Sequence, residues 1–99
     1  MATVTVLYPQ GTTFNKDYYK STHMPLVADK WGKFGLKSWK VIYFPDDAPY
    51  TVQATLEWDN IKQFQEAASA PEAKDVLGDV PNFSNKDPVI MAGEVPYTS

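Results

Sequence analysis

The single histidine of the chain, His23, is the side chain best suited to acid–base chemistry near neutral pH. Tyr19 stands four residues before it, so in a helix a hydroxyl and an imidazole lie on one face and can act on one ligand. An imidazole can remove a proton beside a carbonyl group while a tyrosine hydroxyl donates a hydrogen bond to the enolate oxygen. We therefore predict His23 and Tyr19 as catalytic candidates.

A structural interpretation of His23 stays open beside the catalytic one. Pro25 lacks a backbone N–H and should kink or break a helix after Met24, which frees backbone carbonyls that His23 could satisfy. A haem role would also fall to His23 as axial ligand, since the chain has no cysteine, but no haem motif flanks it. Asp46 and Asp47 are adjacent carboxylates that could bind a metal ion, but no third ligand follows at a suitable spacing. We therefore predict no metal site, and we predict no cofactor.

Aromatic residues make up 14% of the chain, more than one small core needs, which indicates an interface or a pocket for a flat apolar ligand. Tyr8 ends a predicted strand, Trp31 ends a predicted helix and Phe83 lies in a predicted loop, where clefts tend to open. Trp39 lies on a strand face and could equally belong to an interface between two copies. We predict these four residues as the substrate-binding set.

Four segments show the alternation or the turn-bounded apolar runs that are typical of strands: residues 3–8, 36–44, 50–58 and 89–95. In the third, every second residue from 50 to 58 is apolar, so one face is dry and the other polar. Gly93 in the last segment is a possible bulge.

Helical spacing joins residues 14–31 into one segment that Pro25 should interrupt and that Gly32 and Gly35 should end. Asp59 is the predicted N-cap of a second helix. The predicted inner stripe of that helix is Ile61, Phe64 and Ala68.

A third, short helix is predicted from the capping-box spacing of residues 69–72, which places Pro71 at its first position. It should run to Leu77 and be closed by Gly78. Residues 80–85 then read as a loop.

The resulting order, β-α-β-β-α-β over residues 1–99, predicts one α+β domain of ferredoxin-like type. Four antiparallel strands would carry both helical segments on one face. The other face would stay uncovered, and with strands this aromatic we expect it to pair with a second copy across a two-fold axis. The predicted partner is therefore a second copy of the chain, in a homodimer.

Charge and composition exclude several classes of function. The net charge is −3 and the nine lysines are scattered along the chain, so nucleic acid is not an expected partner. The first seven residues lack the features of a signal peptide, and no apolar run approaches the roughly 20 residues that span a bilayer. Together with the absence of cysteine, this leads us to expect a cytoplasmic protein without a membrane partner. Nucleophile elbows and glycine-rich phosphate loops are also missing, which sets aside hydrolytic triads and phosphoryl transfer.

Several motifs together resemble the EthD family of the dimeric α/β-barrel superfamily. Residues 14–27, with a tyrosine pair and His-x-Pro-Leu, look like the helix signature of that family. Residues 4–9 look like its first strand. Further matches are residues 31–32, 35–39, 49–50, 78–83 and 88–94, so the resemblance covers nearly the whole chain.

This resemblance implies a dimeric α/β barrel and a choice of functions. The family includes an accessory protein of ethyl tert-butyl ether degradation, which serves a cytochrome mono-oxygenase system, and fungal proteins tied to polyketide anthrone decarboxylation or dehydration. The wider superfamily contains cofactor-free mono-oxygenases, polyketide cyclases, lactone isomerases and some haem enzymes, so the fold fixes little about the reaction.

Three functional hypotheses follow. The first is cofactor-independent acid–base catalysis on a small aromatic or polyketide-like carbonyl compound, by cyclisation, dehydration, decarboxylation or isomerisation. The second is a non-catalytic accessory protein that binds an apolar compound for an oxygenase system in ether or xenobiotic degradation. The third is a dimeric scaffold without a ligand, which a filled space between helices and sheet would favour.

Overall fold

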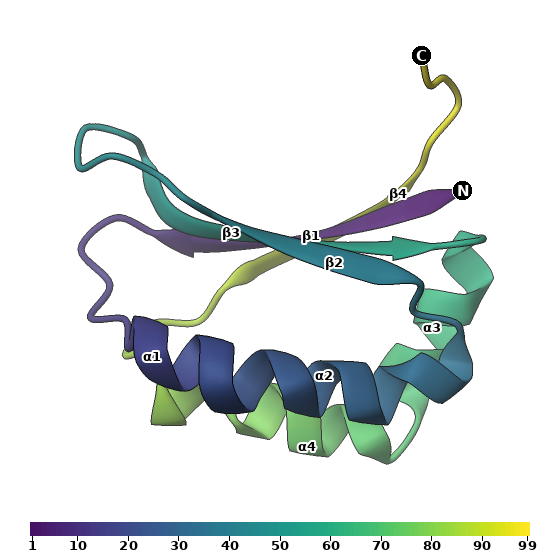
Figure 1. The fold of residues 1–99 in the computed structure, drawn as a ribbon, viewed down its shortest axis with the longest axis horizontal. Coiled ribbons are helices and arrows are strands. Elements are labelled where there is room, and N and C mark those ends of the chain that lie inside the picture. The colour runs from purple at the N-terminus through teal and green to yellow at the C-terminus, as the bar shows by residue number, and fades with distance from the viewer.

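Four antiparallel strands form one sheet in the order β2-β3-β1-β4 in a computed structural model that describes residues 1–99. The strands are β1 (Ala2–Pro9), β2 (Ser38–Tyr43), β3 (Tyr50–Trp58) and β4 (Val89–Glu94). All helices pack on one face of this sheet and the opposite face is uncovered (Figure 1). The predicted ferredoxin-like arrangement is therefore confirmed.

The register of the central strands decides which side chains face the helices. Val4 pairs with Leu56 and Val6 pairs with Ala54, so apolar residues of β1 and β3 share one face, as predicted. The predicted bulge at Gly93 is wrong, because β4 pairs with β1 in unbroken register and the one irregularity in β1 falls at its C-terminal end.

The first helical segment is continuous and contains three kinds of helix (Figure 1). It runs through α1 (Lys16–Tyr18), a π-helical turn (Tyr19–His23), α2 (Met24–Trp31) and a 3-10 turn (Gly32–Phe34). The side chain of Asn15 caps its first turn by accepting a hydrogen bond from the backbone of residue 18.

Of the kink or break predicted after Met24, the break does not occur, and the π turn explains why. In a regular α-helix the residue at position 25 would donate its N–H four residues back, which Pro25 cannot do. The backbone N–H of Met24 instead donates to the carbonyl of Tyr19, five residues back. This wider turn places the proline where no donor is needed, so the helix continues through it.

Gly35 ends the segment because only glycine fits there. Its φ is +112°, and a Cβ atom at this position would lie 2.7 Å from the side chain of Gln63. Gly32, the other glycine predicted to end the helix, still has helical backbone angles.

The second helical segment consists of α3 (Ile61–Ser69) and α4 (Glu72–Gly78). Its N-cap is Asn60, whose Oδ1 accepts a hydrogen bond from the N–H of Gln63, so the predicted cap at Asp59 is off by one residue. Asp59 forms an ion pair with Lys37 at 2.9 Å instead.

Two further details of this segment differ from the prediction. Ala67, not Ala68, is the buried alanine of α3. Ser69 does not form a capping box, because its Oγ donates to the carbonyl of Gln65. Pro71 is the N-cap of α4, not its first helical residue, and no side chain caps the helix. The short α4 is nevertheless present, as predicted, and residues 80–82 of the predicted loop form a 3-10 turn.

The core lies between the sheet and the helices and contains two aromatic clusters. At one end Trp31, Trp58 and Phe64 contact each other, with ring centroids 5.7 to 6.0 Å apart. At the other end the rings of Tyr8, Tyr19 and Phe83 meet, together with those of Phe14 and His23. The candidate chemistry lies at this second end.

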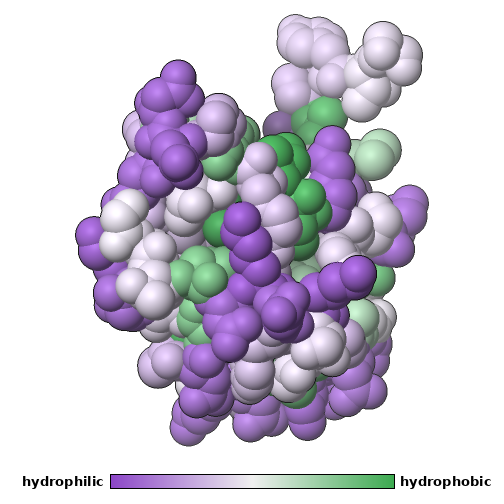
Figure 2. Space-filling model, turned by 60° about the vertical axis from the view of Figure 1, so that its left-hand side comes forward, coloured by the Kyte–Doolittle hydropathy of each residue, from purple (hydrophilic) through white to green (hydrophobic).

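Hydrophobic side chains also reach the surface in patches among hydrophilic ones, and the C-terminal residues project from the body (Figure 2). The sheet register assigns Val89 and Met91 of β4 to the uncovered face, opposite Leu7 and Thr5 of β1. Both are large exposed hydrophobic residues. No helix of the chain combines the length and the apolar character needed to cross a membrane.

Candidate functional site

The π-helical turn brings Tyr19 and His23 together at the sheet side of the first helical segment. Their rings stack with centroids 5.1 Å apart and planes inclined by 20°. Only 2% of Tyr19 and 5% of His23 is exposed, so both face the interior. Phe83 packs on the imidazole from another side at 4.4 Å, which fixes the orientation of the ring.

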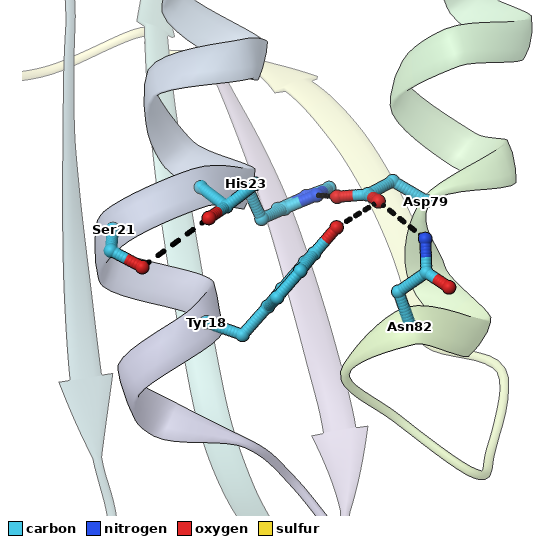
Figure 3. A network of polar contacts seen from close by, with 6 residues as sticks. Tyr18, Ser21, His23, Asp79 and Asn82 are labelled. Atoms are coloured by element: carbon cyan, nitrogen blue, oxygen red, sulfur yellow. Dashed lines mark hydrogen bonds and ion pairs between the residues drawn. The ribbon is translucent and has the colours of Figure 1, made fainter.

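His23 is paired with a carboxylate, not with backbone carbonyls. Its Nδ1 lies 3.0 Å from Oδ2 of Asp79, the residue that follows α4 (Figure 3). The other carboxylate oxygen of Asp79 accepts hydrogen bonds from the Tyr18 hydroxyl at 2.6 Å and from Nδ2 of Asn82 at 2.8 Å. The structure thus gives the histidine a buried acidic partner whose position is fixed by two further donors.

Burial and these contacts set the charges of the pair. Burial lowers the pKa of His23 below its ordinary value, and the contact with Asp79 only partly opposes this. For Asp79, burial raises the pKa, but the hydrogen bonds from Tyr18, Asn82 and His23 outweigh it and the pKa is lowered overall. At neutral pH a neutral imidazole therefore faces an ionised carboxylate.

A carboxylate can only accept hydrogen bonds, so the neutral imidazole donates from Nδ1. This leaves the lone pair on Nε2 of His23, the atom that can take a proton. A histidine whose far nitrogen is held by a buried carboxylate is the arrangement of a general base.

The nearby tyrosines are protonated donors at neutral pH. Burial, as the largest cause, raises the pKa of both Tyr19 and Tyr8 well above the ordinary value for tyrosine. The pKa of Tyr18 is also raised, chiefly by its hydrogen bond to Asp79. Tyr19 can therefore donate to an oxygen that develops negative charge, whereas the hydroxyl of Tyr18 is committed to Asp79.

A narrow cavity of about 30 Å³ lies beside this pair, and 14 of its 16 lining residues are hydrophobic. His23, Tyr19, Tyr8 and Trp31 all line it, so the structure brings together four of the six predicted site residues. The volume holds one or two water molecules, so an organic ligand requires the walls to move apart.

The two remaining predicted residues lie elsewhere. Phe83 contacts the imidazole of His23 but does not line the cavity. Trp39 of β2 is 41% exposed and lines a separate surface groove with Leu36 and Ala28. This placement gives no support to a substrate-binding role for Trp39 at the His23 cavity.

The sequence prediction missed Asp79, Tyr18 and Asn82. The signal that could have found them is the stretch of residues 78–83, whose acidic residue and amide stand between two apolar segments and match the EthD-like pattern. Outside this network, no group of three or more His, Cys, Asp or Glu side chains is placed to hold a metal ion.

Comparison with solved structures relates the whole chain to two EthD-like proteins. One, from Ralstonia eutropha JMP134, has 25% identity and a TM-score of 0.82, and the match covers 99% of this chain and 94% of that one. An ethyl tert-butyl ether (EthD) family protein from Bacillus halodurans C-125 has 24% identity and a TM-score of 0.75, with 96% and 98% covered.

A more distant similarity is to SnoaB from Streptomyces nogalater, a cofactor-independent oxygenase, with 11% identity and a TM-score of 0.72 over 98% of this chain and 94% of that one. At that identity only the fold is shared. No protein-family model and no curated protein sequence matches the chain.

The fold and the arrangement of its helices define a ferredoxin-like protomer of the dimeric α/β-barrel class. Over nearly its whole length the chain is similar to the two EthD-like proteins, in line with the resemblance of its sequence motifs.

Proposed function

We propose that the protein is a cofactor-independent acid–base catalyst that acts on a small aromatic or polyketide-like carbonyl compound. The observation that carries this proposal is the buried pair of His23 and Asp79, which faces an apolar cavity shared with Tyr19. Perturbed titratable groups that converge on a cavity are typical of active sites.

In the proposed reaction, Nε2 of His23 takes a proton from the carbon next to the carbonyl group. The C–H electron pair moves into the enolate, and the Tyr19 hydroxyl donates a hydrogen bond to the enolate oxygen. Asp79 stabilises the imidazolium that forms. Return of the proton to another carbon gives isomerisation, and its departure with a hydroxyl group as water gives dehydration. Attack of the enolate carbon on a second carbonyl of the same molecule gives cyclisation, and the alkoxide that forms takes the proton back from Nε2 of His23.

Proton abstraction can be tested without knowledge of the natural substrate. In D₂O, the exchange of the α-protons of 2-tetralone, a flat neutral ketone, is followed by proton NMR with wild-type protein and with His23→Gln. We expect the wild type to accelerate exchange by roughly 10²- to 10⁴-fold over the variant, the usual contribution of a general base. Equal exchange rates for two folded proteins would contradict the proposal.

A second candidate function is that of an accessory protein that binds an apolar compound for an oxygenase system. The apolar lining of the cavity supports it, as does the similarity to a protein named for ethyl tert-butyl ether degradation. It predicts that the wild type binds apolar compounds but exchanges no α-protons, and that His23→Gln leaves binding unchanged.

We also propose that the protein acts as a homodimer that buries the uncovered sheet face. That face carries Leu7 of the inner strand β1, Ile42 of the edge strand β2, and Val89 and Met91 of the edge strand β4. Apolar side chains on an open sheet face fit contact with a second copy. The cytoplasmic location stays a prediction.

A further inference from the structure

The cavity beside His23 has exposed residues in its wall at one side only. Most of its lining side chains are buried, whereas Leu77 is 45% exposed and Ile90 is 41% exposed. Pro88, which also lines the cavity, is half-buried. Leu77 belongs to α4 and Ile90 to β4, so the wall that reaches solvent lies between these two elements.

An outer groove continues from this wall. It has a volume of about 260 Å³ and shares Leu77, Val80, Pro88 and Ile90 with the cavity. The groove is therefore much larger than the inner cavity of about 30 Å³ and is separated from it by the same side chains. A ligand too large for the cavity can lie with its body in the groove and its reactive end towards His23.

The charged residues along this path are all acidic. No lysine or arginine lines either the cavity or the groove, and Asp87 is the one charged residue of the groove. Asp79 stands behind the imidazole at the inner end. An anionic ligand would lose its hydration here without gaining a cationic partner, which is unfavourable.

We infer that the space between α4 and β4, bounded by Leu77 and Ile90, is the entrance of the His23 cavity and admits neutral apolar molecules in preference to anions. This inference rests on the proposed function for the identity of the inner site, because it assigns the path by which the substrate of that site arrives. Binding through the entrance does not require the chemistry, so the two can be tested apart.

The test uses two fluorescent probes with one skeleton: neutral N-phenyl-1-naphthylamine and its anionic analogue 1-anilinonaphthalene-8-sulfonate. Titration of each probe into the full-length protein gives its Kd. Leu77→Trp narrows the proposed entrance, and Lys74→Trp, on an exposed position of the same helix, is the matched control. A second pair is Ile90→Trp with Lys62→Trp, because Lys62 is an exposed residue of α3 that lines neither the cavity nor the groove.

We expect the neutral probe to bind the wild type at least roughly tenfold more tightly than the anion, and Leu77→Trp and Ile90→Trp to raise its Kd by roughly tenfold or more. The two control variants should bind like the wild type. Absence of neutral-probe binding, equal affinity for the anion, or equal affinity in Leu77→Trp and Lys74→Trp would each overturn the inference. His23→Gln should bind the neutral probe normally, so a failure of the catalytic proposal is seen separately in the exchange assay.

Discussion

At the scale of single residues, the imidazole of His23 packs against the rings of Tyr19 and Phe83, which also contact each other, and its Nδ1 is turned to Asp79. Burial alone would make this histidine a weak and poorly oriented base. The carboxylate of Asp79 fixes which nitrogen carries the proton, and the donors Tyr18 and Asn82 keep that carboxylate ionised. Asp79, Tyr18 and Asn82 therefore define the protonation state of the proposed base, His23.

Asp79→Asn should reduce α-proton exchange by roughly 10²-fold or more, because an amide cannot stabilise the imidazolium and can select the wrong tautomer. The carboxylate raises the pKa of His23 against the effect of burial, so its loss should also move the acid limb of the exchange rate to lower pH. A pH–rate profile of both proteins checks this. An unchanged rate and profile in Asp79→Asn would show that the pair is not the catalytic unit.

The same pair predicts how stability depends on pH. Because the pKa of folded His23 lies below its ordinary value, the unfolded chain binds the proton more readily, and stability is lost as pH falls below about 6.5. The lowered pKa of Asp79 adds a separate loss at lower pH, when the pH falls through its folded value. Urea unfolding at a series of pH values should show that His23→Gln lacks the first loss and keeps the second. If the free energy of unfolding depended on pH in the same way in both proteins, the lowered pKa of His23 would be contradicted.

At the scale of elements, sequence patterns predicted those features that depend on local spacing. The alternation over residues 50–58 gave β3 its exact bounds and its buried face, because one register alone hides the apolar side chains. The pattern did not predict how the helix passes Pro25, since the π turn depends on a backbone hydrogen bond between positions 19 and 24. Local spacing also could not reveal the contact between His23 and Asp79, because the two residues are 56 positions apart in the sequence.

Gly35→Ala tests the element that ends the first helical segment. The positive φ and the close approach of Gln63 both oppose a Cβ atom, so we expect a loss of roughly 1–3 kcal/mol in the free energy of unfolding. Gly32→Ala is the matched control, because that glycine has helical angles and open space around its Cα. Chemical denaturation of both variants checks the difference, and equal stabilities would contradict the account of this turn.

At the scale of the whole molecule, the helices cover one sheet face and leave the other uncovered (Figure 1). The proposed dimer would bury the apolar residues of that second face, while the proposed entrance between α4 and β4 opens on the helix side. The two surfaces are therefore separate, and a second copy on the sheet leaves the path to His23 open.

Met91→Glu places a charge on the uncovered sheet face and should convert the dimer to a monomer, since burial of an unpaired carboxylate is costly. Size-exclusion chromatography with light scattering measures the mass. Lys74→Glu, on an exposed position of the helix layer, is the control that should stay dimeric. A monomeric wild type, or a Met91→Glu variant that remains dimeric, would contradict the proposed interface.

The measurement that tests the central claim most directly is nitrogen-15 NMR of the imidazole, which is unambiguous because the chain has one histidine. The account predicts a neutral ring at pH 7 with the proton on Nδ1, and a titration midpoint below about 6.5. A proton on Nε2, or a midpoint above that value, would contradict the assignment of His23 and Asp79 as a general-base pair.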